Sequence, residues 1–182
     1  LDDQKTVSIY GSSFTSFYIG SNGYITFNEP DTEYRDLLTV HFSKKRISGL
    51  FCDLNPPEGQ SVSWKQLADR AVVTWRNIPE YAATTYSTFQ VEMYFDGRIR
   101  LAWLEVAAQG GIVGLSEGIG VPEGFQETDL SAYELCGGGG GGGAVSAIAY
   151  WKMDDNAANT TVLDSSGTNN HGTARRNTST LT

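Results

Sequence analysis

The stretch TFQVEMYFDGRIRLAW, residues 88–103, decides the fold of this chain. Apolar and polar residues alternate on both sides of Asp96 and Gly97, which is typical of two strands joined by a tight turn. A two-residue loop would place Met93 opposite Arg100 and so put a charge on the apolar face. A three-residue loop instead places Met93 opposite Ile99, because a shift of one residue turns a whole strand over.

We therefore predict the loop Phe95-Asp96-Gly97, with Gly97 in the left-handed conformation. The same register pairs Val91 with Leu101 and Phe89 with Trp103 on the buried face, and Glu92 with Arg100 on the solvent face.

Shorter segments on either side carry the same strand signals. Asn22-Gly23 is a strong turn pair between two apolar runs. A second hairpin is expected around a loop at Ala68-Asp69, with Val62 opposite Trp75 and Trp64 opposite Val73, all on one buried face. The expected strands are residues 14–19, 24–27, 46–52, 62–67, 70–75, 89–94, 98–103 and 111–115. This pattern predicts an all-β protein, an antiparallel β-sandwich.

Composition narrows the possible functions. The chain has 182 residues, of which 40% are apolar, and a formal net charge of −8 with only 13 lysines and arginines. Such an acidic surface argues against nucleic acid and against anionic membranes as partners. No stretch of about 18 apolar residues occurs, so we expect no membrane insertion. Two histidines, and no nucleophile or phosphate-binding motif, lead us to predict that the chain is not an enzyme.

A run of seven glycines divides the chain. Because glycine has no side chain to pack, the run is typical of a flexible linker. We expect a β-sandwich domain over residues 1–136, the linker over residues 137–143, and a strand-forming C-terminal segment over residues 144–182.

Three quoted segments resemble the nidogen-type extracellular module. They are FYIGSNGYITF (17–27), ISGLFCDLNP (47–56) and VVTWRNIPEY with TFQVEMYFDGRIRLAW (within 72–103). That family typically has an Asn-Gly turn between early strands and an apolar strand ending in an acidic residue. The resemblance implies an extracellular or cell-surface, non-enzymatic adhesion or matrix role, as in large secreted proteins of environmental bacteria.

The C-terminal segment resembles a second family. The sequences AIAYWKMDD and TVLDSSGTNNHGTA, within residues 147–174, are similar to the opening of a laminin-G-like, concanavalin A-type jelly roll. The carbohydrate and calcium sites of that family have no matching positions here, so none is carried over.

Cys52 and Cys136 form an even pair. In a secreted protein they would form a disulfide between the middle and the end of the sandwich. The alternative is two separate thiols, with Cys52 a small buried apolar residue. Members of the nidogen-type family often have an acidic residue at the position of Cys52, which weakens a metal site there.

Asp53 and Asn55, with Glu58 nearby, carry oxygen ligands suited to calcium. The alternative, which we favour, is that these side chains cap the turn before Pro56. No catalytic residue and no cofactor other than possible calcium is predicted. Asn159 and Asn177 satisfy the N-glycosylation sequon, which makes both candidate glycan attachment sites.

Residues 144–151, AVSAIAYW, are apolar on both faces, which is typical of a strand covered on both sides. Such a strand pairs with its own sandwich, belongs to a jelly roll that continues further, or adds to a neighbouring molecule. Our leading hypothesis is the third, a homopolymeric extracellular fibre held by donated strands. The proposed assembly residues are Val145, Ala147, Ile148, Ala149, Tyr150 and Trp151.

The competing hypothesis is an adhesion module that binds glycans or matrix proteins. Tyr10, Tyr18, Tyr81 and Tyr86 are the candidates for stacking on sugars. The alternative, again favoured, is that they are ordinary tyrosines of strands and loops.

Overall fold

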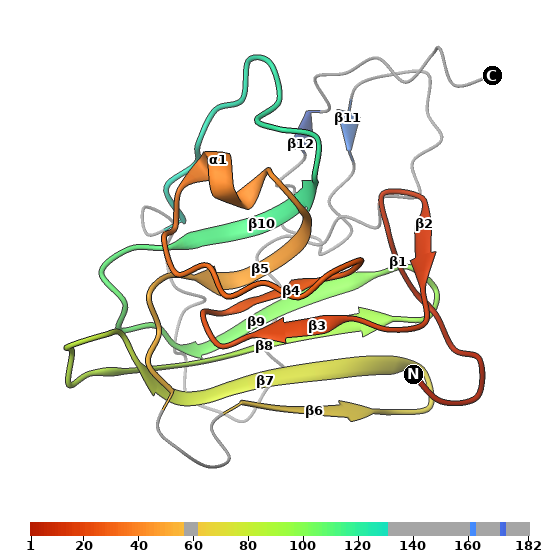
Figure 1. The fold of residues 1–182 in the computed structure, drawn as a ribbon, viewed down its shortest axis with the longest axis horizontal. Coiled ribbons are helices and arrows are strands. Elements are labelled where there is room, and N and C mark those ends of the chain that lie inside the picture. Colours follow the sequence, from red (N-terminus) through yellow and green to blue (C-terminus); the bar gives the residue numbers. More distant parts are fainter. Residues whose placement is uncertain (57–61, 131–160, 163–171, 174–182) are drawn as a thin grey trace. The chain divides into compact units, whose positions relative to one another are not determined.

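The computed structural model describes residues 1–56, 62–130, 161–162 and 172–173, and the chain divides into two units, Leu1–Pro122 and Glu123–Thr182. The regular elements of the first unit are strands, apart from one short helix (Figure 1). Its elements are β1 (Val7–Ile9), β2 (Ser12–Phe14), β3 (Tyr18–Gly20), β4 (Tyr24–Thr26), α1 (Leu38–His41), β5 (Lys45–Phe51), β6 (Val62–Gln66), β7 (Arg70–Pro79), β8 (Tyr86–Tyr94), β9 (Ile99–Glu105) and β10 (Ile112–Glu117).

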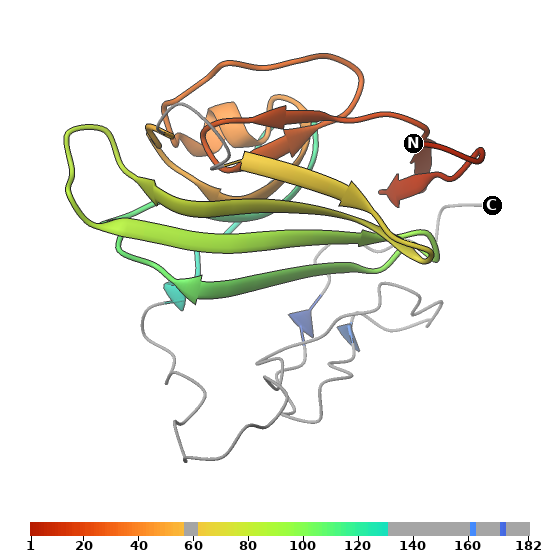
Figure 2. The same ribbon diagram turned by 90° about the horizontal axis from the view of Figure 1, so that it is seen from below.

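Two four-stranded antiparallel sheets form the body of this unit. The smaller sheet has the order β10-β5-β4-β3 and the larger sheet has the order β6-β7-β8-β9, while β1 and β2 form a separate ribbon. Figure 2 shows the two sheets as separate layers. The predicted all-β, antiparallel fold is therefore confirmed.

The core lies between the two layers. Ile25 and Ile47 of the smaller sheet belong to the same buried cluster as Trp75, Phe89 and Val91 of the larger sheet. Burial of this apolar surface is the main force that holds the layers together.

Two tryptophans of the larger sheet also donate hydrogen bonds across the core. The Trp75 indole N–H donates to the Gly20 carbonyl at 3.1 Å, and that of Trp103 donates to the Gly49 carbonyl at 2.8 Å. These bonds give the sheet packing a specific register.

The predicted hairpin registers are confirmed. Met93 lies opposite Ile99, Val91 opposite Leu101 and Phe89 opposite Trp103, and the loop glycine Gly97 has φ +92°. In the other hairpin Val62 lies opposite Trp75 and Trp64 opposite Val73.

One part of the second hairpin prediction was wrong. Trp64 does not share the buried face fully, because 49% of it is exposed. The reason is that β6 is the edge strand of its sheet, and the edge-to-face contact with Phe17 at 5.8 Å between ring centroids covers only part of the indole.

A bulge in β5 changes which way its side chains point. The Gly23 carbonyl accepts hydrogen bonds from the backbone N–H groups of both Gly49 and Leu50, and β5 carries one residue more than β10 over this stretch. Leu50 therefore joins the core between the sheets, whereas the next residue, Phe51, contacts the Tyr24 ring on the outer face.

Residues 28–43, here called the covering segment, lie over that outer face and include α1. The backbone carbonyls of this segment accept hydrogen bonds from Tyr24 and Thr26 of β4, and His41 contacts Ser48 of β5. Nearly every residue of β5 is buried as a result.

In the second unit the structure describes one short antiparallel pair. Here β11 (Thr161–Val162) pairs with β12 (Gly172–Thr173).

Candidate functional site

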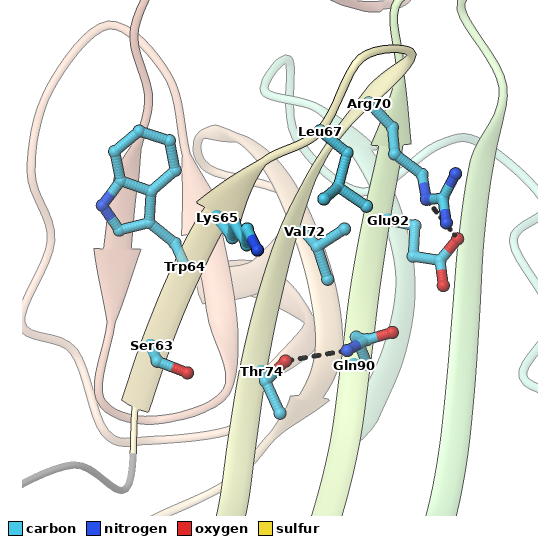
Figure 3. Close-up of a pocket in the computed structure, with 9 residues that line it drawn as sticks. All are labelled: Ser63, Trp64, Lys65, Leu67, Arg70, Val72, Thr74, Gln90 and Glu92. Atoms are coloured by element: carbon cyan, nitrogen blue, oxygen red, sulfur yellow. Dashed lines mark hydrogen bonds and ion pairs between the residues drawn. The ribbon is translucent and has the colours of Figure 1, made fainter.

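The outer face of the larger sheet carries a shallow depression lined mostly by polar side chains. Alternation along the strands directs Lys65 of β6, Val72 and Thr74 of β7, and Gln90 and Glu92 of β8 to this side. They line this depression of about 440 Å³ (Figure 3). The Trp64 side chain points to the other side of β6 (Figure 3).

Glu92 is the electrostatic centre of this face. It is only 6% exposed, and its carboxylate lies 3.2 Å from Arg70 Nε and 3.7 Å from Arg100 Nη1. The Tyr94 hydroxyl donates a hydrogen bond to it at 2.8 Å. Burial, together with this bond to the carboxylate, raises the pKa of Tyr94. The two arginines therefore compensate a nearly buried negative charge.

A second polar contact lies beside it. The Gln90 side-chain amide donates to the Thr74 hydroxyl at 2.8 Å, between directly opposed positions of β7 and β8. Such cross-strand pairs order the face without giving it a nucleophile or a base.

The open edge of β9 borders the same face. Among the described residues β9 pairs only with β8. Leu104 is an extra residue between the Trp103–Phe89 and Glu105–Thr88 pairs, and its side chain is 86% exposed. Val106, just past the strand, is 50% exposed. An unpaired strand edge beside exposed apolar side chains favours pairing with another strand.

The one buried histidine of the described residues is not available for catalysis. His41 Nδ1 lies 2.9 Å from the Ser48 hydroxyl, which resembles a base beside a nucleophile. Both residues are buried between the covering segment, to which His41 belongs, and β5, so a substrate has no access. Burial lowers the pKa of His41 to about 4, and the pair is a structural hydrogen bond between neutral groups.

Cys52 is buried and has no disulfide partner among the described residues. Burial, with smaller contributions from nearby carboxylates, raises the pKa of the Cys52 thiol to about 12, which leaves it unreactive near neutral pH. Cys136 lies outside the described residues, so the disulfide stays a prediction.

Asp53 and Asn55 hold two loops together through their backbones. The Asp53 carbonyl accepts a hydrogen bond from Tyr81 N–H, and Asn55 N–H donates to the Pro79 carbonyl. Across the described residues no group of three or more histidine, cysteine or acidic side chains is placed to hold a metal ion. Glu58 lies outside them, so calcium binding also stays a prediction.

The remaining predicted sites are placed only in part. Tyr81 is 71% and Tyr86 is 48% exposed, whereas the Tyr10 hydroxyl donates to the Leu115 carbonyl. The assembly residues and the two sequons fall outside the described residues: Val145, Ala147, Ile148, Ala149, Tyr150, Trp151, Asn159 and Asn177.

Sequence reasoning found one ion pair of this face and missed the others. The hairpin register placed Glu92 opposite Arg100. It did not identify Arg70, which reaches Glu92 from β7. The two predicted hairpins could not have located it, because they fix the registers of β6 with β7 and of β8 with β9, but not that of β7 with β8.

The first unit corresponds closely to a known family. The model of the family described as NIDO related matches residues 6–134. No match is found among curated proteins or among solved structures. In the described part of the chain, no helix is long and apolar enough to cross a membrane. Family membership indicates an extracellular module. From the extent of the match, which includes both sheets and their connecting loops, we conclude that the chain belongs to the NIDO-related family.

Proposed function

We propose that this chain is a non-enzymatic structural module of an extracellular assembly, in which copies associate by adding a strand to an open sheet edge. The observation that carries the proposal is the edge of β9, where no strand among the described residues pairs on the side away from β8 and where Leu104 is 86% exposed. Strand addition uses backbone hydrogen bonds for affinity and side-chain contacts for specificity.

Two features of the chain support this proposal. On the face beside the edge, Arg70 and Arg100 compensate the Glu92 carboxylate, so this carboxylate presents no unpaired negative charge to a partner. The chain also contains an apolar segment, residues 144–151, that follows a glycine run able to supply reach. Contacts of this head-to-tail kind do not close on themselves, and repetition produces a filament.

Sedimentation of the full chain over a range of concentrations tests the proposal. We expect oligomers whose size grows with concentration, and a large reduction for the Leu104→Lys variant. Leu37→Lys is the matched control, because Leu37 is also an exposed leucine, at 51%. A monomer at every concentration would contradict the proposal.

A glycan- or matrix-binding adhesion module is the second candidate. The exposed rings of Tyr81 and Tyr86, which flank the loop between β7 and β8, favour it. Aromatic faces of this kind present both an apolar body and a polar group to a ligand. Saturable binding to a glycan array that Tyr81→Ala removes, and that the control Tyr34→Ala leaves unchanged, would support this function.

A further inference from the structure

We propose that the open edge of β9 is the acceptor for residues 145–151, which add to the larger sheet as an antiparallel fifth strand. The inference rests on the proposed function for its biological meaning. The surface and the register are new, and they can be tested separately from assembly.

The other sheet edges of the described unit are less suitable. The strand β3 has only three residues. At β6, the Gln66 side-chain amide exchanges two hydrogen bonds with the backbone of Asp2. At β10, the Leu115 carbonyl already accepts the Tyr10 hydroxyl. The seven residues of β9 have no comparable contact on the open side among the described residues.

The backbone of β9 offers a regular set of hydrogen-bonding groups. Tyr94 N–H donates to the Arg98 carbonyl at 2.8 Å, so Tyr94 and Arg98 form a hydrogen-bonded pair of the β8–β9 ladder. The pair Glu92–Arg100 lies two residues further along and is therefore of the same kind. Because paired and unpaired positions alternate in antiparallel sheets, Ile99, Leu101 and Trp103 direct their N–H and C=O groups to the open side. Five consecutive residues, ending before the bulge at Leu104, can therefore receive a strand.

The chemistry of residues 145–151 fits this edge. The segment carries no charge, so covering it requires no desolvation of an ion. It is also as long as β9, with seven residues in each. The exposed Leu104 and Val106 give it apolar surface to cover at the end of the strand.

Side-chain sizes favour one antiparallel register, with Ile148 opposite Ala102. Over residues 147–149 each large side chain then meets a small one on the same face, since Ala149 lies opposite Leu101 and Ala147 opposite Trp103.

The same register places Tyr150 opposite Arg100. This arrangement allows a cation–π contact on the polar face, next to Glu92.

Disulfide trapping in the full chain tests this register. The background carries Cys136→Ser and keeps the buried Cys52. Cysteines at Ala102 and Ile148 would occupy a pair without backbone hydrogen bonds, with Cα atoms about 4.5 Å apart, which a disulfide can span. Two control pairs combine Ile148→Cys with Lys65→Cys on β6, and Ala102→Cys with Ser146→Cys, which is two residues out of register.

We expect the 102–148 pair to cross-link about tenfold more than either control, the ratio that a preference of about 1.4 kcal/mol gives. Intact mass and non-reducing gels separate the outcomes. A cross-link between chains supports both this inference and the proposed function. A cross-link within one chain supports the β9 edge and contradicts assembly between copies. Equal or greater cross-linking in a control, or none at 102–148, overturns this inference even if the chain forms oligomers.

Discussion

The two sheets differ in what lies on their outer faces. The smaller sheet is covered by residues 28–43, and Arg46 and Ser48 on its outer face are buried, in contact with Asp31 and His41 of that segment. The larger sheet keeps exposed side chains along both edge strands, β6 and β9. Among the described residues of the first unit, the outer face of the smaller sheet is therefore covered, whereas that of the larger sheet keeps exposed side chains.

The covered face has a buried arginine at its centre. The Arg46 side chain is fully buried, and its Nη2 atom donates to Asp31 of the covering segment at 2.6 Å. Its guanidinium lies over the Tyr24 ring at 4.3 Å and near the Phe51 ring at 4.9 Å. Burial raises the pKa of Tyr24 to about 12 in the same layer. A single ion pair therefore joins the covering segment to the sheet.

Breaking this pair gives the largest expected effect. Asp31→Ala leaves a buried arginine without its counter-charge, which lowers the free energy of unfolding by about 3–5 kcal/mol. Urea denaturation measures the change. Glu33→Ala is the control from the same segment, because that carboxylate pairs with the exposed Arg35. Equal effects of the two substitutions would show that Asp31 does not hold the covering segment in place.

The turn glycines of the two sheets provide a sharper comparison. Gly23 has φ +81°, and an added Cβ would overlap the Leu50 carbonyl oxygen, whereas Gly97 has φ +92° with open space around it. Gly23→Ala should cost about 3 kcal/mol from strain and overlap together, and Gly97→Ala about 1 kcal/mol from strain alone. Thermal or urea unfolding of both variants checks the order, and a larger loss for Gly97→Ala would contradict it.

Acid should weaken the covered face through His41. The pKa of His41 is about 4 in the folded chain and near its ordinary 6.5 when unfolded. Between these values the unfolded chain binds the proton first, so stability present above pH 6.5 is lost as the pH falls toward 4. The loss is on the order of 2–3 kcal/mol.

Denaturation of the wild type and of His41→Gln at about pH 7.5 and about pH 4.5 isolates this contribution from the carboxylates. The variant should lose less stability on acidification. If both proteins lose the same amount, His41 is not the group responsible.

The smallest effect on stability is expected on the open side. Leu104→Lys should change the free energy of unfolding by less than about 0.5 kcal/mol, because the side chain is 86% exposed. The same substitution should nevertheless reduce association. A destabilisation comparable to that of Asp31→Ala would mean that Leu104 serves the fold rather than a partner.

The sequence predicted best where alternation and burial act together. The register from Phe89 to Trp103 followed from keeping charges off the apolar face, and the structure has the same pairs. Exposure of Trp64 was missed because a strand pattern does not reveal which strand stands at the edge. The bulges in β5 and at Leu104 each insert one extra residue into a strand. A single inserted residue leaves the alternation of apolar residues in the sequence nearly unchanged, so neither bulge was predicted.

The covering segment was the hardest part to foresee. Residues 28–43 lack a strong period, and α1 has only four residues with no side-chain cap. Arg46 lies in an otherwise apolar run, and only the position of Asp31 in space explains its burial. Long-range pairing of this kind carries no local sequence signal. The proposed donor strand and the sequons fall outside the described residues and stay predictions.

Backbone hydrogen exchange of β9 tests the central claim most directly. If the larger sheet takes up a strand at its open edge, the amides of Ile99, Leu101 and Trp103 should exchange fast in dilute full chain and become protected as concentration rises. The amides of β6, at the opposite edge, should exchange at an unchanged rate. Unchanged exchange of the three β9 amides at every concentration would contradict the account.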